Sequence, residues 1–419
     1  MFVSALLLVA LSFVLWTSNQ KKILRIEVYA GSSWDVPNSR ENRVLDNIIR
    51  QFEKSYPNVK VVYESGIPKK DYDNWLAEKI LKGEQADVFM VPENDFSMLA
   101  SSGAFKSLDS LISKEEAAAY YPVAYQAGQY QGHSYALPIE SNPVMMCVNK
   151  DLLEKEGISI PNSNWTLEDL YAICQKVTKD TDGDSLIDQY GITDYTWKQA
   201  LVAYNGHLRN QNGVNVDSVE MHQALSFISK LDSLNQRYKV TSNDFDEGKV
   251  AFYPMSLAQY RTYKPYPYHV AKYSRFSWTC IPMPAAKAGI PATQVKTSLF
   301  AMSSKTKQDK LAWEFMKLLC QNHKNQQELF AKSQGTSVLT SVVKSSQTKK
   351  ILQADDFGLD SLTSQRLDHM MKHSVLDISR DLDYHSLERL DYLLGNALKN
   401  NEIDSILPSI QREMEETGK

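Results

Sequence analysis

The chain has 419 residues, of which 43% are hydrophobic and 23% charged, and its formal net charge is −4. This length predicts two or more domains, and this composition is that of a globular protein, which excludes general disorder. The small net charge gives no broad basic field, so nucleic acids and anionic membrane surfaces are not expected as main partners. The four cysteines are widely spaced and form no C-x-x-C pair, so they signal neither a zinc site nor a redox pair, and we expect buried free thiols.

The first twenty residues differ from the rest of the chain. Residues 2–16 form an almost unbroken apolar run, which is short for a membrane-spanning helix but suits a signal peptide or an anchor. No basic residue precedes the run, and no cysteine or small-x-small pattern follows it, so we expect a basic leader upstream of Met1. Lys21, Lys22 and Arg25 argue for the opposite membrane orientation. Residues 1–20 are predicted to be a signal or membrane-anchor segment of an exported protein.

The next part of the chain alternates strand and helix patterns. Alternating, β-branched and aromatic residues predict strands over 23–29, 59–63 and 87–91. Apolar residues at helical spacing predict helices over 45–52 and 75–81. The order of strand, helix, strand, helix and strand predicts an open parallel α/β sheet.

Polar and aromatic side chains follow the ends of these strands. Trp34 and Asp35 follow the first strand, and Glu93 and Asp95 follow the third. Because ligands of such sheets bind beyond the carboxyl ends of the strands, we expect a ligand site at this edge. The alternative for Glu93 and Asp95 is that they complement the dipole of the next helix.

Residues 130–153 predict a connection between two lobes. Residues 133–137 and 145–149 are short apolar and aromatic runs that predict strands. The polar, proline-flanked segment 139–142 lies between them and suits a crossover from one domain to the next, with Glu140 near the seam. An ordinary surface hairpin fits this segment equally well.

Residues 180–188 match the spacing of a calcium-binding loop. The carboxylates at its first, third, fifth and ninth positions belong to Asp180, Asp182, Asp184 and Asp188, and Leu186 offers its carbonyl at the seventh. The match is imperfect, since glycine stands at the fourth position and Gly191 replaces the usual glutamate at the twelfth. A solvated Asx-turn is the alternative. Because four clustered acids repel one another, we favour a structural calcium ion.

The second half of the chain combines helices with an unusually aromatic stretch. A capping pattern at Thr166 predicts a helix to about residue 179, and an apolar stretch further on ends in Tyr204 and Asn205. Between residues 253 and 278, aromatic rings alternate with basic and amide side chains, which suits stacking on sugar faces, whereas core packing is the alternative for several of them. From residue 324 onward the chain is predicted to be essentially helical.

Several segments resemble one known family when their order and spacing are taken together. They are FEKSYPNVKVVYE, ADVFMVPEND, HSYALPIESNPVMMCVNKDLL, SNWTLEDLYAICQKVTKDTDGDSLIDQYG, FDEGKVAFYPMSLAQY, IPMPAAKAG and LGNALKNNEIDSILPSIQREMEE. The chain resembles, over roughly residues 23–416, the extracellular solute-binding proteins of bacterial ABC importers, the broad family that includes maltose-binding protein. It departs from the family in lacking the lipobox cysteine and the glycine pair near Thr297.

The resemblance implies an α/β fold of two lobes with a hinge, an interlobe cleft and a helical C-terminal region. The N-terminal lobe is expected over residues 21–138, with part of 285–340 returning to it, the C-terminal lobe over 139–284, and helices packing on the lobes over 341–419. The resemblance assigns the cleft to Trp34, Glu93, Asp95, Glu140, Tyr204, Tyr260 and Trp278, and Asn205 is expected to hydrogen-bond there.

The expected function is reversible capture of a sugar or oligosaccharide without chemistry, followed by delivery to the membrane permease of an ABC transporter. We expect a monomer that requires no cofactor, placed outside the cytoplasmic membrane or in the periplasm. An exported glycosidase is the rival, because paired carboxylates in an aromatic cleft also fit that chemistry. A sugar-binding component of a sensor system is a second alternative.

Overall fold

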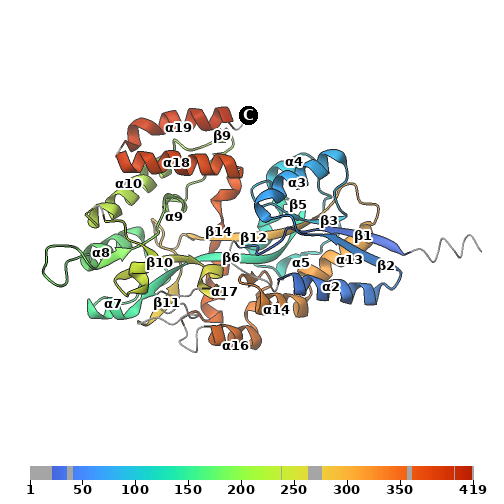
Figure 1. The fold of residues 1–419 in the computed structure, drawn as a ribbon, viewed down its shortest axis with the longest axis horizontal. Coiled ribbons are helices and arrows are strands. Elements are labelled where there is room, and N and C mark those ends of the chain that lie inside the picture. The colour runs from blue at the N-terminus through green and yellow to red at the C-terminus, as the bar shows by residue number, and fades with distance from the viewer. Residues whose placement is uncertain are drawn as a thin grey trace, which may run out of the picture.

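The computed structural model describes residues 21–34, 41–236, 238–262, 276–355, 361–400 and 402–417. The predicted signal or anchor segment, Asp35 and residues 263–275 of the aromatic stretch lie outside these ranges. The described chain forms two halves side by side, joined by strands that run from one half into the other (Figure 1). Among the described residues, no helix is both long and apolar enough to cross a membrane.

The first half contains the predicted parallel sheet. Its strands are β1 (Lys22–Glu27), β2 (Val59–Glu64) and β3 (Val88–Val91), and β1 pairs in parallel with both of the others. The connecting helices are α2 (Glu41–Ser55) and α3 (Lys69–Lys82). Gly83, at φ 68°, ends α3 in a left-handed conformation that glycine adopts without steric cost. The strand-helix alternation predicted from the sequence is therefore confirmed.

One long strand, not two strands with a polar link, makes the predicted crossover between the halves. β6 (Ala136–Asn149) is continuous and occupies the middle of a sheet whose order is β2-β1-β3-β12-β6-β10-β7. The prediction of two strands with a polar link, and the hairpin alternative, are both wrong. The polar residues Glu140 and Asn142 keep strand geometry because they pair with Ser298 and Lys296 of β12 (Thr293–Met302).

The second half is built around the far end of this sheet. Its strands are β7 (Tyr190–Ile192), β10 (Val250–Ser256) and β11 (Trp278–Ile281). Its helices are α7 (Lys150–Lys155), α8 (Leu167–Val177), α9 (Trp197–Ala203), α10 (Val219–Leu234), α11 (Ser242–Asp246) and α12 (Leu257–Thr262). The Thr166 side chain accepts a hydrogen bond from the Asp169 backbone N–H and begins α8, as predicted.

Short elements complete both halves. Between β3 and β6 lie α4 (Phe96–Ser101), α5 (Lys114–Ala118), α6 (Pro122–Ala127), β4 (Gln129–Tyr130) and β5 (His133–Ser134). Between α9 and α10 lie β8 (Arg209–Asn210) and β9 (Gly213–Val214).

The chain after β12 is mainly helical, as predicted. Its helices are α13 (Asp309–Cys320), α14 (His323–Lys332), α15 (Thr340–Val343), α16 (Ser346–Asp355), α17 (Ser364–Lys372), the 3₁₀ turn η1 (Ile378–Asp381), α18 (Tyr384–Asn400) and α19 (Ile403–Thr417). Two short strands interrupt them: β13 (Thr336–Ser337) pairs with β6, and β14 (Ser374–Leu376) pairs with β12. The predicted lobe boundaries remain predictions.

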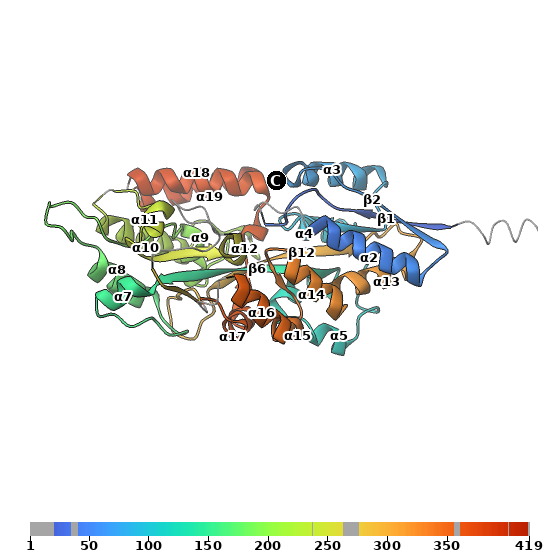
Figure 2. The same cartoon turned by 60° about the horizontal axis from the view of Figure 1, so that its bottom comes forward.

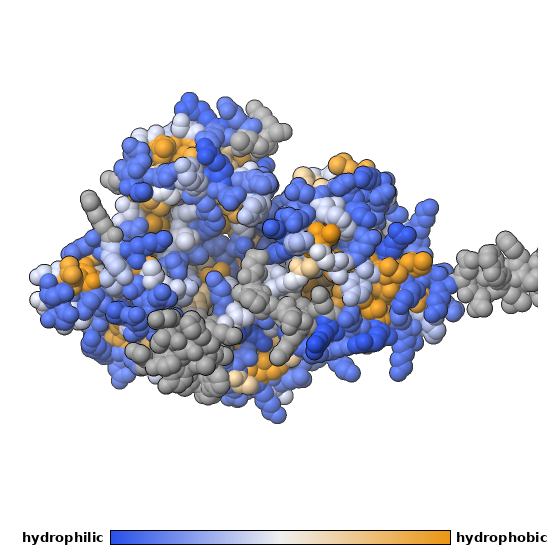
Figure 3. Space-filling model, in the orientation of Figure 1, coloured by the Kyte–Doolittle hydropathy of each residue, from blue (hydrophilic) through white to orange (hydrophobic). Residues whose placement is uncertain are grey.

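Different helices cover the two faces of the sheet. Helices α18, α19 and α3 lie on one face, whereas α14 to α17 lie on the other (Figure 2). On the first face, a notch separates the α18–α19 pair from α3 and α4 (Figure 3). The carboxyl ends of β1 and β3 belong to the half that carries α3 and α4, which is where the strand-end rule expects a ligand.

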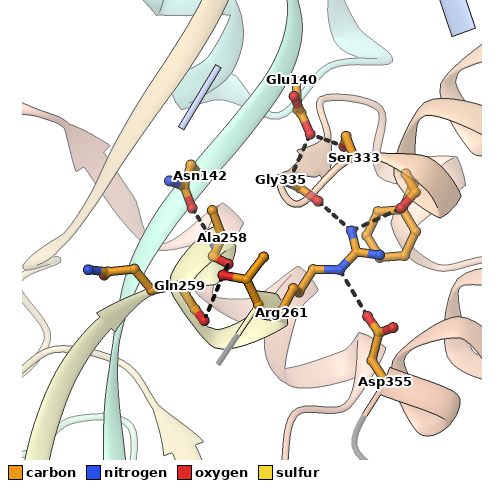
Figure 4. Close-up of polar contacts among 10 residues, drawn as sticks. Glu140, Asn142, Ala258, Gln259, Arg261, Ser333, Gly335 and Asp355 are labelled. Carbon is orange, nitrogen blue, oxygen red and sulfur yellow. Dashed lines mark hydrogen bonds and ion pairs between the residues drawn. The ribbon is translucent and has the colours of Figure 1, made fainter. Parts of the chain in front are cut away.

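A buried polar network fastens the loop between α14 and β13 to both β6 and α12 (Figure 4). The Glu140 carboxylate accepts hydrogen bonds from the Gly335 N–H at 2.8 Å and from the Ser333 hydroxyl. The Arg261 guanidinium donates to the Gly335 carbonyl at 2.9 Å and pairs with Asp355 at 2.9 Å. Both polar groups of Gly335 are thus satisfied by side chains, which a buried loop requires.

Gly335→Ala should destabilise the fold, because an added Cβ would lie 2.5 Å from a carboxylate oxygen of Glu140. We expect a loss of about 1–3 kcal/mol in the free energy of unfolding, measured by urea denaturation. Gly395→Ala is the matched control, since it adds the same methyl group to an exposed helical position with no neighbouring atom within 4 Å. That control should be neutral or gain up to about 1 kcal/mol. Equal effects of the two changes would contradict the close approach at Gly335.

Candidate functional site

Two acidic residues follow the end of β3, and basic groups from other segments of the chain lie near the first of them. Glu93 follows β3, and burial raises the pKa of its carboxyl to about 7 although nearby Lys296 and Arg380 act to lower it. Asp377, which follows β14, acts in the opposite direction. A carboxyl that titrates near neutral pH exists as both donor and acceptor, so Glu93 can hydrogen-bond a hydroxyl in either direction.

Asp95 lies beside Glu93 in the sequence and in a more acidic environment. Burial raises the pKa of its carboxyl to about 6, and the negative charges of Asp73 and Asp383 add to this effect. Asp95 is the N-cap residue of α4, yet its side chain makes no capping hydrogen bond. The helix-end alternative therefore accounts for the place of Asp95 before α4, but no capping hydrogen bond uses its carboxyl group.

Two residues that sequence reasoning missed contact both halves of the protein. In η1, Arg380 donates to the Ala127 carbonyl at 3.3 Å and lies 5.6 Å from the ring centre of Phe96, so it contacts the first half. The neighbouring Asp381 accepts from the Leu208 N–H at 3.3 Å and so contacts the second half. The only signal in the sequence was the charged run from Asp377 to Asp383 within an otherwise helical region.

Tyr204 and Asn205 lie on the second half, just before the segment that contacts η1. Tyr204 ends α9 and is half-buried against the hydrophobic cluster of that half. Asn205 is exposed and adopts a left-handed conformation at φ 60°, which asparagine tolerates better than most residues. The two predicted residues thus belong to the half opposite to that of Glu93 and Asp95.

Trp34 lies at the end of the first strand region and is 8% exposed. Its backbone N–H donates to the Ser32 hydroxyl at 3.1 Å, and Lys69 donates to the neighbouring Ser33 carbonyl at 2.8 Å. The indole N–H of Trp34 is buried without a hydrogen-bond acceptor among the described residues. Such a donor favours an additional polar partner.

Tyr260 and Trp278, predicted to stack on a ligand, are core residues. Tyr260 is fully buried and Trp278 is 1% exposed, and their ring centres lie 5.5 Å apart in a cluster that also contains Phe245. No ring face remains for a sugar, so the prediction for these two residues is wrong. The aromatic residues at these two positions complete the core between β10, β11 and α12.

Glu140 is 3% exposed, and its carboxylate serves the 333–335 loop. It also lines a cavity of about 70 Å³ with Tyr29, Asn325 and apolar side chains. Ligand pockets have volumes of about 300–1,000 Å³, so this cavity is too small for an oligosaccharide. In this structure the Glu140 carboxylate fastens the 333–335 loop to the shared strand, and its role in ligand binding stays a prediction.

The predicted calcium loop gathers three of its acids. Carboxylate oxygens of Asp180, Asp182 and Asp184 all lie within 4.8 Å of one another. Asp180 accepts from the backbone of Gly183 and Ser185, both at 2.7 Å, as in an Asx-turn. Asp188 instead accepts from the Thr181 N–H at 2.9 Å, and the Leu186 N–H donates to Asp184 at 2.8 Å. The geometry suits both alternatives, and calcium binding stays a prediction.

Solved structures match nearly the whole chain. The sugar-binding protein MalE from Xanthomonas citri has a TM-score of 0.74 at 15% identity, covering 94% of this chain and 97% of that one. The cyclic α-maltosyl-1,6-maltose binding protein from Arthrobacter globiformis has a TM-score of 0.72 at 14% identity, covering 94% and 98%. At these identities the likeness shows the fold, which is that of the two-lobe periplasmic binding proteins, as predicted.

The sequence itself carries the family assignment. The model of the bacterial extracellular solute-binding protein family matches residues 47–355, and the chain belongs to that family. A maltotriose-binding protein from Pyrococcus abyssi is 25% identical over 138 residues, which are 33% of this chain and 30% of that protein. A putative binding protein from Brucella abortus is 24% identical over 292 residues, or 66% of this chain and 68% of that protein.

Glu93→Gln should change how stability depends on pH. The folded-state pKa of Glu93, about 7, exceeds its ordinary value of 4.5, so the folded chain binds the additional proton more tightly than the unfolded chain does. The stability from this group is therefore complete below pH 4.5 and is lost as the pH rises through about 7. Urea denaturation at pH 5 and pH 7.5 should show a smaller loss in the variant than in the wild type. Parallel pH profiles would contradict the burial of this carboxyl group.

Calcium should bind to the 180–188 loop, because the clustered oxygens of its acids offer the hard ligands that this ion prefers. Calorimetric titration after chelator treatment should give a binding isotherm that Asp184→Asn weakens. Asp217→Asn, which changes an acid outside the loop, is the control. No heat at millimolar calcium would leave the loop as an Asx-turn alone.

Proposed function

We propose that this protein binds a sugar or oligosaccharide in the notch between its halves and delivers it to the permease of an ABC importer. The observation that carries the proposal is the pair of acids after β3: burial raises the pKa of Glu93, which has Lys296 and Arg380 nearby, to about 7, and that of Asp95, which has Asp73 and Asp383 nearby, to about 6. A sugar hydroxyl both donates and accepts hydrogen bonds, and mixed carboxyl and basic groups satisfy both demands. The two opposing halves would bury the ligand.

The names of the relatives support a carbohydrate ligand. One relative is a maltotriose-binding protein, one matching structure is a Listeria monocytogenes ABC substrate-binding protein in complex with cycloalternan, and another carries bound mannotriose. These ligands are all oligosaccharides. The notch is open at one side, which suits a chain of several rings better than an enclosed pocket would (Figure 3).

Ligand capture in this proposal is a change in the population of open and closed arrangements. Glu93 and Asp95 belong to one half, and Tyr204 and Asn205 belong to the other. A ligand that contacts both pairs binds the closed arrangement more tightly and therefore shifts the population toward it. The shared strands β6 and β12 connect the halves at the base of the movement, and closure is the signal to the permease.

The protein acts in this proposal as an exported monomer that performs no chemistry. Its family is extracellular, and the apolar segment before residue 21 would serve as its export signal or anchor. The family and the structural relatives are binding proteins. A glycosidase and a sensor component remain the alternatives to be distinguished by experiment.

Asp95→Asn should weaken sugar binding by about tenfold or more, since it removes one charged hydrogen-bond acceptor from the notch. Intrinsic tryptophan fluorescence across a panel of maltose-, mannose- and cello-oligosaccharides measures the affinity. Glu78→Gln is the control, because it changes an exposed carboxylate that pairs with Lys82 of the same helix. The melting temperature without ligand should stay the same or rise in Asp95→Asn, because a buried acid is removed.

A response to amino acids or polyamines, with none to any sugar, would refute the carbohydrate assignment. Chromogenic glycosides test the rival enzyme: turnover by the wild type that Glu93→Gln abolishes would favour a glycosidase. A pull-down of a histidine kinase rather than a permease would favour the sensor.

A further inference from the structure

Two of the four cysteines lie directly opposite each other in the sheet. Cys147 of β6 and Cys280 of β11 are paired residues in the antiparallel register, and their sulfur atoms are 3.7 Å apart. They are separated by 133 positions in the sequence, so their proximity is a product of the fold. The spacing of the cysteines in the sequence predicted no pair among them.

The backbone geometry at this pair suits a covalent link. Directly opposed residues of antiparallel strands have Cα atoms about 4.5–5.5 Å apart. Disulfides span Cα separations of about 4.4–6.8 Å, so the strands need not move apart or together for the bond to form. Rotation of the two side chains would bring the sulfur atoms from contact to bonding distance.

The other two cysteines provide an internal comparison. Cys174 packs in the hydrophobic cluster of the second half and Cys320 in that of the first half. Cys147 and Cys280 both belong to a third cluster, which also contains Tyr260 and Trp278. All four are buried thiols that form no disulfide in this structure. Only one pairing is therefore favoured by the register and the distances.

We propose that Cys147 and Cys280 form a disulfide when the exported chain folds in an oxidising environment. Disulfides form and persist outside the cytoplasm, where the family to which the chain belongs resides. The oxidant is a small-molecule or protein disulfide. One thiolate attacks it and releases one thiol, and the second thiolate then attacks the mixed disulfide and releases the other. Two thiols lose two protons and two electrons, and the external disulfide is reduced to two thiols.

Burial determines when the reaction occurs. Both sulfur atoms belong to fully buried residues, so a dissolved disulfide has no access to them in the folded chain. Exchange therefore takes place during folding, and the finished bond is protected from reductants. The link would join the central strand β6 to β11 within the second half. It does not depend on which ligand the notch binds.

The test is disulfide mapping of the full chain refolded from urea, either with a mixture of oxidised and reduced glutathione or with a phosphine reductant. Alkylation in denaturant followed by mass spectrometry should find two labelled cysteines after oxidative refolding, Cys174 and Cys320, and a linked Cys147–Cys280 peptide. The reductant should give four labelled cysteines. The oxidised form should melt roughly 5 °C or more above the reduced form, because the link closes a long loop in the unfolded chain.

Matched variants separate this pair from the other thiols. Cys174→Ala should retain the linked peptide, whereas Cys147→Ala should lose it and expose Cys280 to the label. Four labelled cysteines in oxidatively refolded wild type with native circular dichroism would overturn the proposal, as would any other pairing. The wild-type map decides even if Cys147→Ala does not fold. Sugar binding by the reduced protein tests the proposed function separately.

Discussion

Pairing between β6 and β12 is the interaction on which the rest of the structure depends. These strands run through the centre of the sheet, so their polar residues are buried and must find partners. The Ser141 and Thr297 hydroxyls lie 2.9 Å apart, and Asn142 accepts from the Ala258 N–H at 2.9 Å. Glu140 holds the 333–335 loop from the same strand. The central strand thereby organises segments that follow it by more than a hundred residues.

The carboxyl groups of Glu93 and Asp95 lie in an environment unlike that of Glu140. Beside β6 the Glu140 carboxylate accepts hydrogen bonds from the Gly335 N–H and the Ser333 hydroxyl, so the protein itself satisfies this buried acid. At Glu93 and Asp95, burial raises the pKa of both carboxyls instead. Groups held in an environment that disfavours their charge are typical of functional sites, where a ligand rather than the protein supplies the missing interactions.

Local patterns predicted the first half well. Apolar periodicity predicted β1 to β3 and their helices, and the strand-end rule singled out Glu93 and Asp95, which follow β3, as candidate ligand residues. Local patterns could not predict contacts between residues that lie far apart in the sequence. The polar segment around Glu140 predicted a break between two strands. The residues that satisfy Glu140, Ser333 and Gly335, lie far along the chain and leave no signal near it. No periodicity distinguishes a ring that stacks on a sugar from one that packs in the core, so Tyr260 was misassigned.

The residues missed altogether, Arg380 and Asp381, act through tertiary contacts that leave no local pattern. They are also adjacent in sequence, and one contacts each half. Adjacent residues of η1 are therefore bound to both halves. If the halves move relative to each other, the side-chain torsions of Arg380 and Asp381 must absorb the motion, or one of the two contacts must break. Such a movement would thus be opposed at η1 as well as by the shared strands.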